Sequence, residues 1–292
     1  MFHHNLASRT YNTANDLFDQ ENMIERERNR YIRVIKDLRI RETSLNLALE
    51  EAVSRFVSEG YSPPTIRFWR DDKSVIIGRS QNVFAEVDLA FCEDNNIPIF
   101  RRVSGGGAVI HHKGNLNYSV YLPRPLTSRV KESSLKWNKL TGRTLLEEGL
   151  PSDARENGLF IDGFKVGGSA QSRRWGLLHH GTLLVNPDKI MDRMDSVLKA
   201  PRRNYKKQKK AVSSEPSDVS DLESLAGNSI HYKKLIDSLV LKLSLGIDLT
   251  PKTGSINSAE IRLAKWLKKS KYGRLKADKK GIKDRNDPTG LK

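Results

Sequence analysis

Residues 101–120 read RRVSGGGAVIHHKGNLNYSV, and this stretch carries the strongest information about the fold. A β-rich run leads into three consecutive glycines, and a second β-rich run leaves them. Glycine permits positive φ angles and places no side chain over the backbone, so the N–H groups of such a turn can approach a bound anion closely. Arg101 and Arg102, directly before the turn, add guanidinium groups suited to phosphate or carboxylate. Because a plain hairpin turn needs only one or two glycines, the pattern favours an anion-binding turn.

Lys165 lies in a second glycine-rich run, GFKVGGSAQ at residues 163–171. Glycines weaken a strand unless something approaches the backbone closely at that point. An isolated lysine is usually a solvated surface group, but Phe164, Val166 and the glycines make this one a candidate for a cation inside a cleft. Such an ammonium is suited to holding a phosphate and an acyl oxygen together.

Two histidine pairs, His111-His112 and His179-His180, occur in strand-like runs. Adjacent side chains on a strand point to opposite faces, so neither pair is expected to bind one metal ion, and zinc is disfavoured. One member of each pair is expected to be packed or hydrogen-bonded. The single cysteine, Cys92, excludes a disulfide framework and any cysteine-based metal cluster. The sequence therefore predicts no metal-ligating residues.

The positive charge is concentrated in two segments. The net charge is +16, of which residues 199–210 supply +7 and residues 255–292 supply +8. The remaining body is close to neutral, whereas nucleic-acid binders usually carry their basic residues on a folded face. We interpret both segments as solvated, with the alternative that they attract an acidic protein partner and accelerate its encounter. A basic nucleic-acid-binding protein is a hypothesis that rests on charge alone, and it is not favoured.

Length and hydropathy limit the class of protein further. The chain has 292 residues, 37% of them apolar, which is enough for one large domain or two small ones with a sizeable core. No apolar run approaches the roughly 20 residues that span a bilayer. Residues 1–29 are polar, show no sustained period and lack a signal-peptide pattern. We expect a soluble cytoplasmic protein, without membrane contact, that begins with a disordered extension over residues 1–29.

Residue patterning outside the glycine runs predicts a mixture of strands and helices. Strands are expected at residues 31–35, 65–70, 74–78, 98–103, 107–111, 117–122, 159–161, 165–171 and 176–185. Helices are expected at residues 45–58, 87–95, 133–149, 188–198, 231–244 and 258–269. Thr43 or Ser44 is the expected N-cap of the first helix, and Asp71-Asp72-Lys73 is the expected turn of a hairpin joining 65–70 to 74–78. Because strict βαβ alternation is missing, the order predicts an α+β domain on a mixed or antiparallel sheet.

Taken in order, the runs RRVSGGGAVIHHKGNLNYSV, GFKVGGSAQ and HHGTLLVN resemble the lipoate–protein ligase A family of the biotin/lipoate ligase superfamily. The fragments NLALEE at residues 46–51 and VIIGRSQN at residues 75–82 support the likeness. It extends from about residue 31 to residue 245 and implies a biotin/lipoate ligase catalytic-domain-like fold, with the sheet flanked by helices. The chain departs from the family at His112, where the family commonly has aspartate.

The resemblance implies an enzyme that uses ATP and Mg²⁺ to convert lipoate to lipoyl-AMP and then transfers the lipoyl group to a lysine of an acceptor domain. Lys165 matches the family's lysine that holds the lipoyl carbonyl and the phosphate, and Arg102 matches its nucleotide-contacting arginine. The family's adenylate-binding strand corresponds to Gly107, Ala108, Val109 and Ile110. Its acyl tunnel corresponds to Gly105, Gly106, Gly167, Gly168, Ser169 and Ala170. Asn157 and His180 also fall on family-like positions.

The same resemblance suggests a catalytic domain over residues 30–250, followed by a basic C-terminal helix and tail over residues 251–292. Longer family members carry a C-terminal accessory domain, and only about 45 residues follow the likeness here. A separate accessory protein is therefore an expected partner. The expected acceptor is an acidic lipoyl domain of the 2-oxoacid dehydrogenase E2 or glycine cleavage H protein type.

Two related activities remain open at this stage. An octanoyltransferase of the same fold would form an acyl-enzyme on an activated cysteine, yet Cys92 beside Ala90 and Phe91 has the setting of an ordinary buried residue. A biotin ligase is expected to show a tryptophan near its arginine-rich glycine loop, and RRVSGGGAVIHH contains none.

Overall fold

The computed structural model describes residues 31–129, 134–200, 202, 204–207, 211–273, 277–278 and 281–282. Its main feature is an eight-stranded mixed sheet in the order β11-β1-β2-β6-β10-β9-β8-β7. β1 runs parallel to β2 and β11, and the other neighbours are antiparallel. The α+β prediction is therefore confirmed. The strands are β1 (Tyr31–Arg41), β2 (Thr65–Asp71), β6 (Asn115–Leu122), β7 (Asp153–Arg155), β8 (Gly158–Ile161), β9 (Phe164–Ser172), β10 (Leu177–Leu184) and β11 (Thr250–Thr253).

A second sheet of three strands, in the order β4-β3-β5, carries the ends of the glycine loop. It consists of β3 (Ser74–Ile77), β4 (Ile99–Arg101) and β5 (Val109–His111). The expected hairpin between residues 65–70 and 74–78 is wrong, because β2 pairs with β1 and β6 whereas β3 pairs with β4 and β5. All four residues of β3 are buried, so this strand is covered on both faces in a sheet of its own. The polar residues that suggest a turn mark a crossing between sheets.

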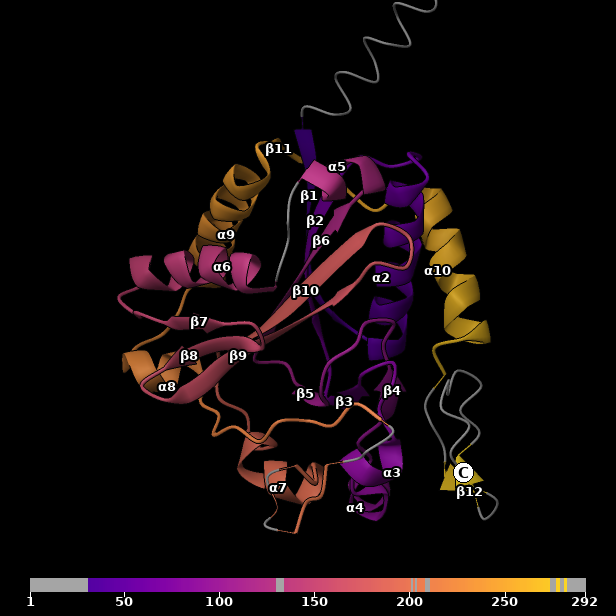
Figure 1. Ribbon diagram of the computed structural model, residues 1–292, viewed down its shortest axis with the longest axis vertical. Coiled ribbons are helices and arrows are strands. Elements are labelled where there is room, and N and C mark those ends of the chain that lie inside the picture. Colours follow the sequence, from indigo (N-terminus) through magenta and orange to yellow (C-terminus); the bar gives the residue numbers. More distant parts are fainter. Residues whose placement is uncertain are drawn as a thin grey trace, which may run out of the picture.

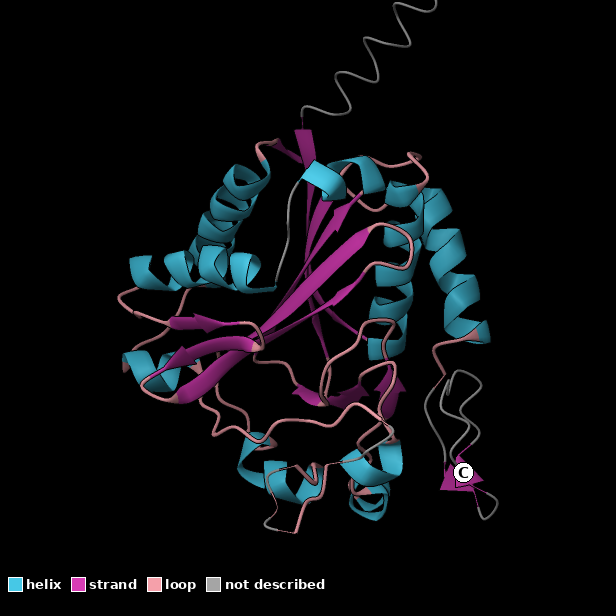
Figure 2. Ribbon diagram, viewed as in Figure 1, coloured by secondary structure: helices cyan, strands magenta, loops and turns pink. Residues whose placement is uncertain are grey.

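Long helices cover both faces of the main sheet (Figures 1 and 2). On one face lie α6 (Ser134–Glu147) and α9 (Tyr232–Ile247), whose apolar residues share a core cluster with β1, β2, β6 and β10. On the other lie α2 (Thr43–Ser58) and α10 (Ser258–Ser270), which pack against each other and against Tyr121 and Leu178. The predicted flanking helices are therefore confirmed.

Short elements complete the described part of the chain. Around the small sheet lie α3 (Val83–Glu86), α4 (Leu89–Asp94), the 3₁₀ turn η1 (Met191–Arg193) and α7 (Met194–Val197), which form a third core cluster with it. In place of the single helix expected at residues 188–198, the structure has a short 3₁₀ helix followed by a short α-helix. The remaining elements are α5 (Arg124–Arg129), α8 (Leu222–Ala226) and a two-stranded sheet of β12 (Ala277–Asp278) and β13 (Gly281–Ile282).

The start of α2 differs from the sequence expectation. The helix begins at Thr43, its N-cap is Glu42, and no side chain caps it. The hydroxyl of Thr43, expected to cap the helix, instead lies 2.8 Å from the hydroxyl of Ser74 on β3. A tertiary partner has therefore replaced the local one, and this bond ties α2 to the small sheet.

The C-terminal segment is joined to the body of the protein. The sequence-based boundary between residues 250 and 251 falls inside β11, which pairs with β1. Asn257 caps α10, and Glu260 completes the capping box while accepting hydrogen bonds from Arg33 of β1 at 2.6 and 3.1 Å. The expected extension over residues 1–29, parts of the basic loop and residues 283–292 lie outside the described residues. No helix within the described ranges is long and apolar enough to cross a membrane.

Candidate active site

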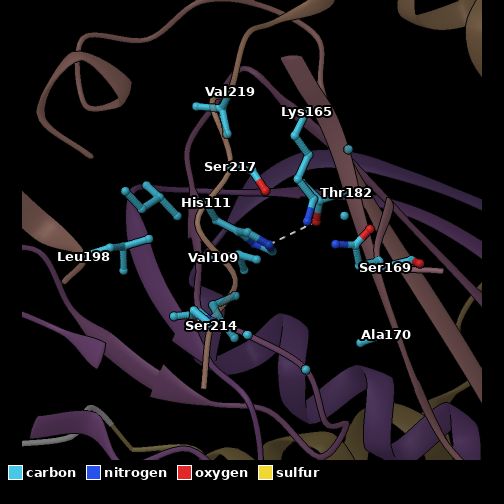
Figure 3. Close-up of a pocket in the computed structure, with 18 of the residues that line it drawn as sticks. Val109, His111, Lys165, Ser169, Ala170, Thr182, Leu198, Ser214, Ser217 and Val219 are labelled. Atoms are coloured by element: carbon cyan, nitrogen blue, oxygen red, sulfur yellow. Dashed lines mark hydrogen bonds between the residues drawn. The ribbon is translucent and has the colours of Figure 1, made fainter. Parts of the chain in front are cut away.

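A cavity of about 390 Å³ lies where the glycine loop, β9, β10 and the irregular segment 211–220 meet. Figure 3 shows Lys165, Thr182 and Ser169 on one wall, with His111 and Val109 between them and Ser214, Ser217, Leu198 and Val219 opposite. Of the residues expected from the sequence, Arg102, Gly106, Gly107, Ala108, Val109, Ile110, Asn157, Lys165, Gly167, Gly168, Ser169, Ala170 and His180 border this cavity. Gly105 does not, although it belongs to the same loop. Segments more than 50 residues apart in sequence therefore form one site.

Arg102 shapes the glycine loop. Its Nη2 donates to the carbonyl oxygens of Gly105 at 2.6 Å and Gly107 at 2.8 Å, and its Nε donates to Ser104 Oγ at 3.0 Å. Burial lowers the pKa of this guanidinium to about 10. Gly106 has a φ of +84°, in the region that only glycine adopts without strain. Arg102, which the family resemblance matches to a nucleotide-contacting arginine, therefore also holds the glycine loop in its observed shape.

Lys165 offers an uncommitted cation to the cavity. Its stem lies over glycines of β8 and β9, since a Cβ added to Gly158 would stand 2.9 Å from Lys165 Cε. Within the described part of the chain, no side chain forms a hydrogen bond or ion pair with its Nζ, which lies 5.7 Å from the centre of the Phe160 ring. Burial lowers the pKa of Lys165, and the nearby carboxylate of Glu215 partly opposes this. A partly buried ammonium of this kind is available for an anionic ligand.

Residues 211–220 form a wall that the sequence analysis did not foresee. Ser214 Oγ accepts hydrogen bonds from the Ala108 N–H at 2.9 Å and from Gln81 Nε2 at 3.0 Å, which holds this segment against the glycine loop. Further along, Lys165 N–H donates to the Asp218 carbonyl at 2.8 Å. A run of serines, acids and a proline after a lysine tract reads as a solvated loop, so only the three-dimensional contacts identify its role.

The histidine pairs follow the alternation expected for strands. His111 lines the cavity, with Nδ1 3.1 Å from Asp71 Oδ1 and Nε2 3.2 Å from Thr182 Oγ1, whereas His112 is buried outside it. His180 likewise lines the cavity, whereas His179 is fully buried and stacks on Trp137 at 5.3 Å. Burial lowers the pKa of both His112 and His179. The pairs therefore separate into one site residue and one packed residue each.

Two buried carboxylates behind these histidines were missed by the sequence analysis. Asp71, at the end of β2, contacts His111, and Glu50 of α2 contacts His180. Asp71 was assigned to the turn of a hairpin, and Glu50 was noted only as part of a helix fragment. A carboxylate among apolar helix residues is the signal that was available, because such groups are buried only when paired.

Metal and thiol chemistry each require a particular arrangement of histidine, cysteine or acidic residues. No group of three or more histidine, cysteine, aspartate or glutamate side chains within them is arranged to hold a metal ion. Cys92 is buried in α4 within the third core cluster, and it does not border the cavity.

The chain matches the family model described as lipoyl protein ligase A/B catalytic domain over residues 42–244. It is 40% identical over 150 residues to a putative lipoate-protein ligase A of Saccharomyces cerevisiae, a match that covers 49% of this chain. The matched segment spans only 36% of the length of that curated relative.

Two solved structures resemble this fold. A lipoate-protein ligase A bound with ATP is 27% identical with a TM-score of 0.65, covering 83% of this chain and 95% of that one. A bi-partite lipoate protein ligase of Thermoplasma acidophilum, described together with its E2 lipoyl domain, is 28% identical with a TM-score of 0.67, covering 83% and 94% respectively.

Proposed function

Because the chain belongs to the lipoyl protein ligase A/B catalytic domain family, we propose that it is an ATP-dependent lipoate–protein ligase. It forms lipoyl-AMP from lipoate and ATP, and then transfers the lipoyl group to a lysine of an acceptor lipoyl domain. The observation that carries this proposal is the meeting of Lys165, the triple-glycine loop and apolar side chains in one cavity. Such a cavity suits a ligand with an anionic head and an aliphatic chain.

In the first step, a carboxylate oxygen of lipoate attacks the α-phosphorus of ATP, the P–O bond to the pyrophosphate breaks, and pyrophosphate leaves. Both reactants are anions, so a fixed cation near the reacting atoms lowers the barrier without having to reorganise. Lys165 fills this role, because its partly buried ammonium has no protein anion bonded to it within the described residues. Backbone N–H groups of the glycine loop add dipoles that favour negative charge. No protein nucleophile is required.

The apolar part of the wall suits the acyl chain. Leu47, Ile76, Val109, Ile110 and Leu184 border the cavity and come from α2, β3, β5 and β10. Burying the aliphatic chain of lipoate against them contributes about 0.8 kcal/mol for each methylene removed from water. That binding energy positions the carboxylate beside Lys165.

In the second step, the amine of the acceptor lysine attacks the lipoyl carbonyl carbon. An amide bond forms, the bond from the carbonyl carbon to the AMP oxygen breaks, and AMP leaves while the nitrogen releases a proton. The Lys165 ammonium draws charge from the carbonyl and phosphate oxygens of the mixed anhydride, which favours this attack.

ATP is a substrate here, and Mg²⁺ would accompany it. With nucleotides this ion is usually bound through the phosphates and water, together with one or two carboxylates. The protein's own contribution is then the ammonium of Lys165 and the backbone groups of the loop.

Two partners fit the proposed reaction. One is an acidic lipoyl domain, of the 2-oxoacid dehydrogenase E2 or glycine cleavage H protein type, which the basic segments would attract. The other is a separate accessory protein, as in the bi-partite ligase of Thermoplasma acidophilum. A transfer rate that does not fall with added salt would argue against the electrostatic attraction of the acceptor.

The test is incubation of the chain with ATP, lipoate and a lipoyl acceptor domain, followed by mass spectrometry of the acceptor. We expect a mass increase of one lipoyl group that is lost in Lys165→Ala and kept in Lys252→Ala, an exposed lysine on β11. A second arm supplies preformed lipoyl-AMP in place of ATP and lipoate. Transfer in that arm alone would indicate that adenylation needs the accessory protein. No modification in either arm would refute the proposal.

A further inference from the structure

A continuous chain of hydrogen bonds joins α2 to the glycine loop beside the cavity. Glu50 Oε1 lies 2.9 Å from His180 Nδ1, and His180 Nε2 lies 2.6 Å from Ser104 Oγ. Ser104 directly precedes the three glycines, and Arg102 Nε donates to its hydroxyl oxygen at 3.0 Å. The glycine loop is thus connected to the buried carboxylate of Glu50 on α2, which lies more than 50 residues earlier in the chain.

The directions of these bonds follow from the chemistry of Glu50. Its side chain is 1% exposed, and the Ser119 hydroxyl donates to the same carboxylate oxygen at 2.6 Å. Burial alone raises the pKa of Glu50, but electrostatic attraction to His180, hydrogen bonds from His180 and Ser119, and the charge of Arg67 hold it below its usual value. An ionised carboxylate only accepts hydrogen bonds. The proton between Glu50 and His180 is therefore on Nδ1.

With Nδ1 protonated in a neutral ring, Nε2 is an acceptor, and the Ser104 hydroxyl donates to it. The oxygen of Ser104 is then free to accept from Arg102 Nε, which agrees with the observed bond. Each donor in the series meets an acceptor. Reversing the tautomer of His180 would make both Arg102 Nε and His180 Nε2 donors to Ser104 Oγ, and the Ser104 hydrogen would then have no acceptor among the described residues.

The three residues have the order of a serine nucleophile, a histidine base and an orienting carboxylate, but Ser104 is placed differently from a nucleophile. It is 1% exposed and does not border the cavity, whereas Glu50 and His180 do. One of its oxygen lone pairs is directed at Arg102. A hydroxyl that cannot meet a ligand carbonyl cannot form an acyl-enzyme. The contacts of Ser104 instead hold the glycine loop in position.

We propose that Glu50 is a positioning residue that fixes the tautomer of His180, and that His180 through Ser104 fixes the shape of the glycine loop. We call this Glu50–His180–Ser104 series the device. Its geometry is independent of the proposed ligase function, and only its consequence, the binding of lipoate and the adenylate by the loop, rests on that function. The loop shape depends on three anchors, since Arg102 holds the carbonyls of Gly105 and Gly107 while Ser104 holds the strand end. Loss of the carboxylate therefore loosens the loop through His180 and Ser104.

Glu51 provides a matched control on the same helix. It is also buried, but its carboxylate accepts hydrogen bonds from Lys271 at 2.6 Å and from Arg55 and Tyr272, on the side of α2 that faces the C-terminal segment. Glu51→Gln therefore removes a buried charge from α2, as Glu50→Gln does, while leaving the contacts of His180 in place. A purely structural contribution of Glu50 would make the two variants alike.

The experiment uses the full chain labelled with ¹⁵N in its histidine rings and glycine amides. In the native protein we expect the His180 ring, assigned by comparison with His180→Gln, to show a protonated Nδ1 and an unprotonated Nε2 at neutral pH. Glu50→Gln should change that signature, shift the amides of Gly105, Gly106 and Gly107, and weaken binding of a sulfamoyl analogue of lipoyl-AMP. We expect a loss of about 10–100-fold, by analogy with removal of the hydrogen-bond partner of a metal-bound histidine. Glu51→Gln should lower the melting temperature only.

Ser104→Ala separates the two links of the device. It should shift the three glycine amides and weaken analogue binding while leaving the tautomer of His180 unchanged. A protonated Nε2 in the native ring overturns the proposal, as does equal loss of binding in Glu50→Gln and Glu51→Gln. Because the ring and amide signals are measured without catalysis, they test this device even if the native chain adenylates no lipoate, an outcome that would instead refute the proposed function.

Discussion

Gly105 and Gly106 are adjacent and chemically identical, yet the structure predicts that alanine has a different effect at each. A Cβ at Gly105 would meet nothing within 4 Å, and its φ lies outside the left-handed region. Gly106 has a φ of +84°, and a Cβ there would also stand 3.1 Å from Arg102 Nη2. We therefore expect Gly106→Ala to damage the loop and Gly105→Ala to leave it nearly intact.

The magnitude follows from the backbone. A residue with a Cβ in the left-handed region costs roughly 1–2 kcal/mol, and RT of about 0.6 kcal/mol converts this into a 5–30-fold loss of the native loop population. Asparagine tolerates that region better than alanine, so Gly106→Asn should recover part of the loss. Gly105→Ala should stay within about twofold of the native protein, the range of a substitution that touches nothing.

The assay is the initial rate of pyrophosphate release from ATP and lipoate, supported by the dissociation constant of the lipoyl-AMP analogue. Both should worsen in the order Gly105→Ala, Gly106→Asn, Gly106→Ala. Circular dichroism and the melting temperature provide the control, because the loop contributes little to the main core. If Gly105→Ala were as damaging as Gly106→Ala, the loop would not have the backbone described, and the reasoning would fail.

Three further predictions concern charge and the core. Burial lowers the pKa of Lys165, so its ammonium is lost as pH rises through a value below the ordinary lysine range. The fall of kcat/KM for pyrophosphate release at alkaline pH should occur at this lowered pKa. Glu215→Gln removes an attraction that raises the pKa of Lys165, so it should move this fall in kcat/KM to lower pH. Cys92→Ser should leave acyl transfer within about twofold; loss of transfer would favour the octanoyltransferase. Glu260→Gln leaves the guanidinium of Arg33 buried beside a neutral amide, so the free energy of unfolding should fall by about 3–5 kcal/mol. The melting temperature should then fall by an amount on the order of 10 °C. A shift of less than about 2 °C would show that α10 contributes little to the stability of the fold.

Elements with a strong local pattern were predictable from the sequence. The helix expected at residues 133–149 is α6 (Ser134–Glu147), and the strand expected at 176–185 is β10 (Leu177–Leu184). Periodicity sets which residues of such a segment face the core, and burial then selects the matching element. The separation of His111 from His112, and of His179 from His180, follows from the same period of two.

Pairing partners were not predictable, because they depend on residues far away in the sequence. The Asp71-Asp72-Lys73 segment has the composition of a hairpin turn, yet Asp71 is fully buried against His111, which lies 40 positions later. Thr43 was a plausible helix cap for the same local reason, and Ser74 takes its hydroxyl instead. In each case a polar side chain that can satisfy a neighbour along the chain satisfies a distant group instead. The local sequence therefore identifies polar residues that need a hydrogen-bond partner, but it does not predict which distant residue is that partner.

Glu50 and Glu51 are adjacent in sequence, yet their side chains have different partners because they leave α2 in different directions. Successive residues of a helix are turned by about 100°, so one carboxylate faces His180 at the cavity while the other faces the C-terminal segment at Lys271 and Tyr272. The first therefore bears on the shape of the site and the second on the attachment of α10. A sequence pattern assigns both to a solvated face, because an acid is normally exposed unless it is paired. Since both pairs involve partners more than 100 positions away, their distinct roles become visible only when α2 is placed between the sheet and α10.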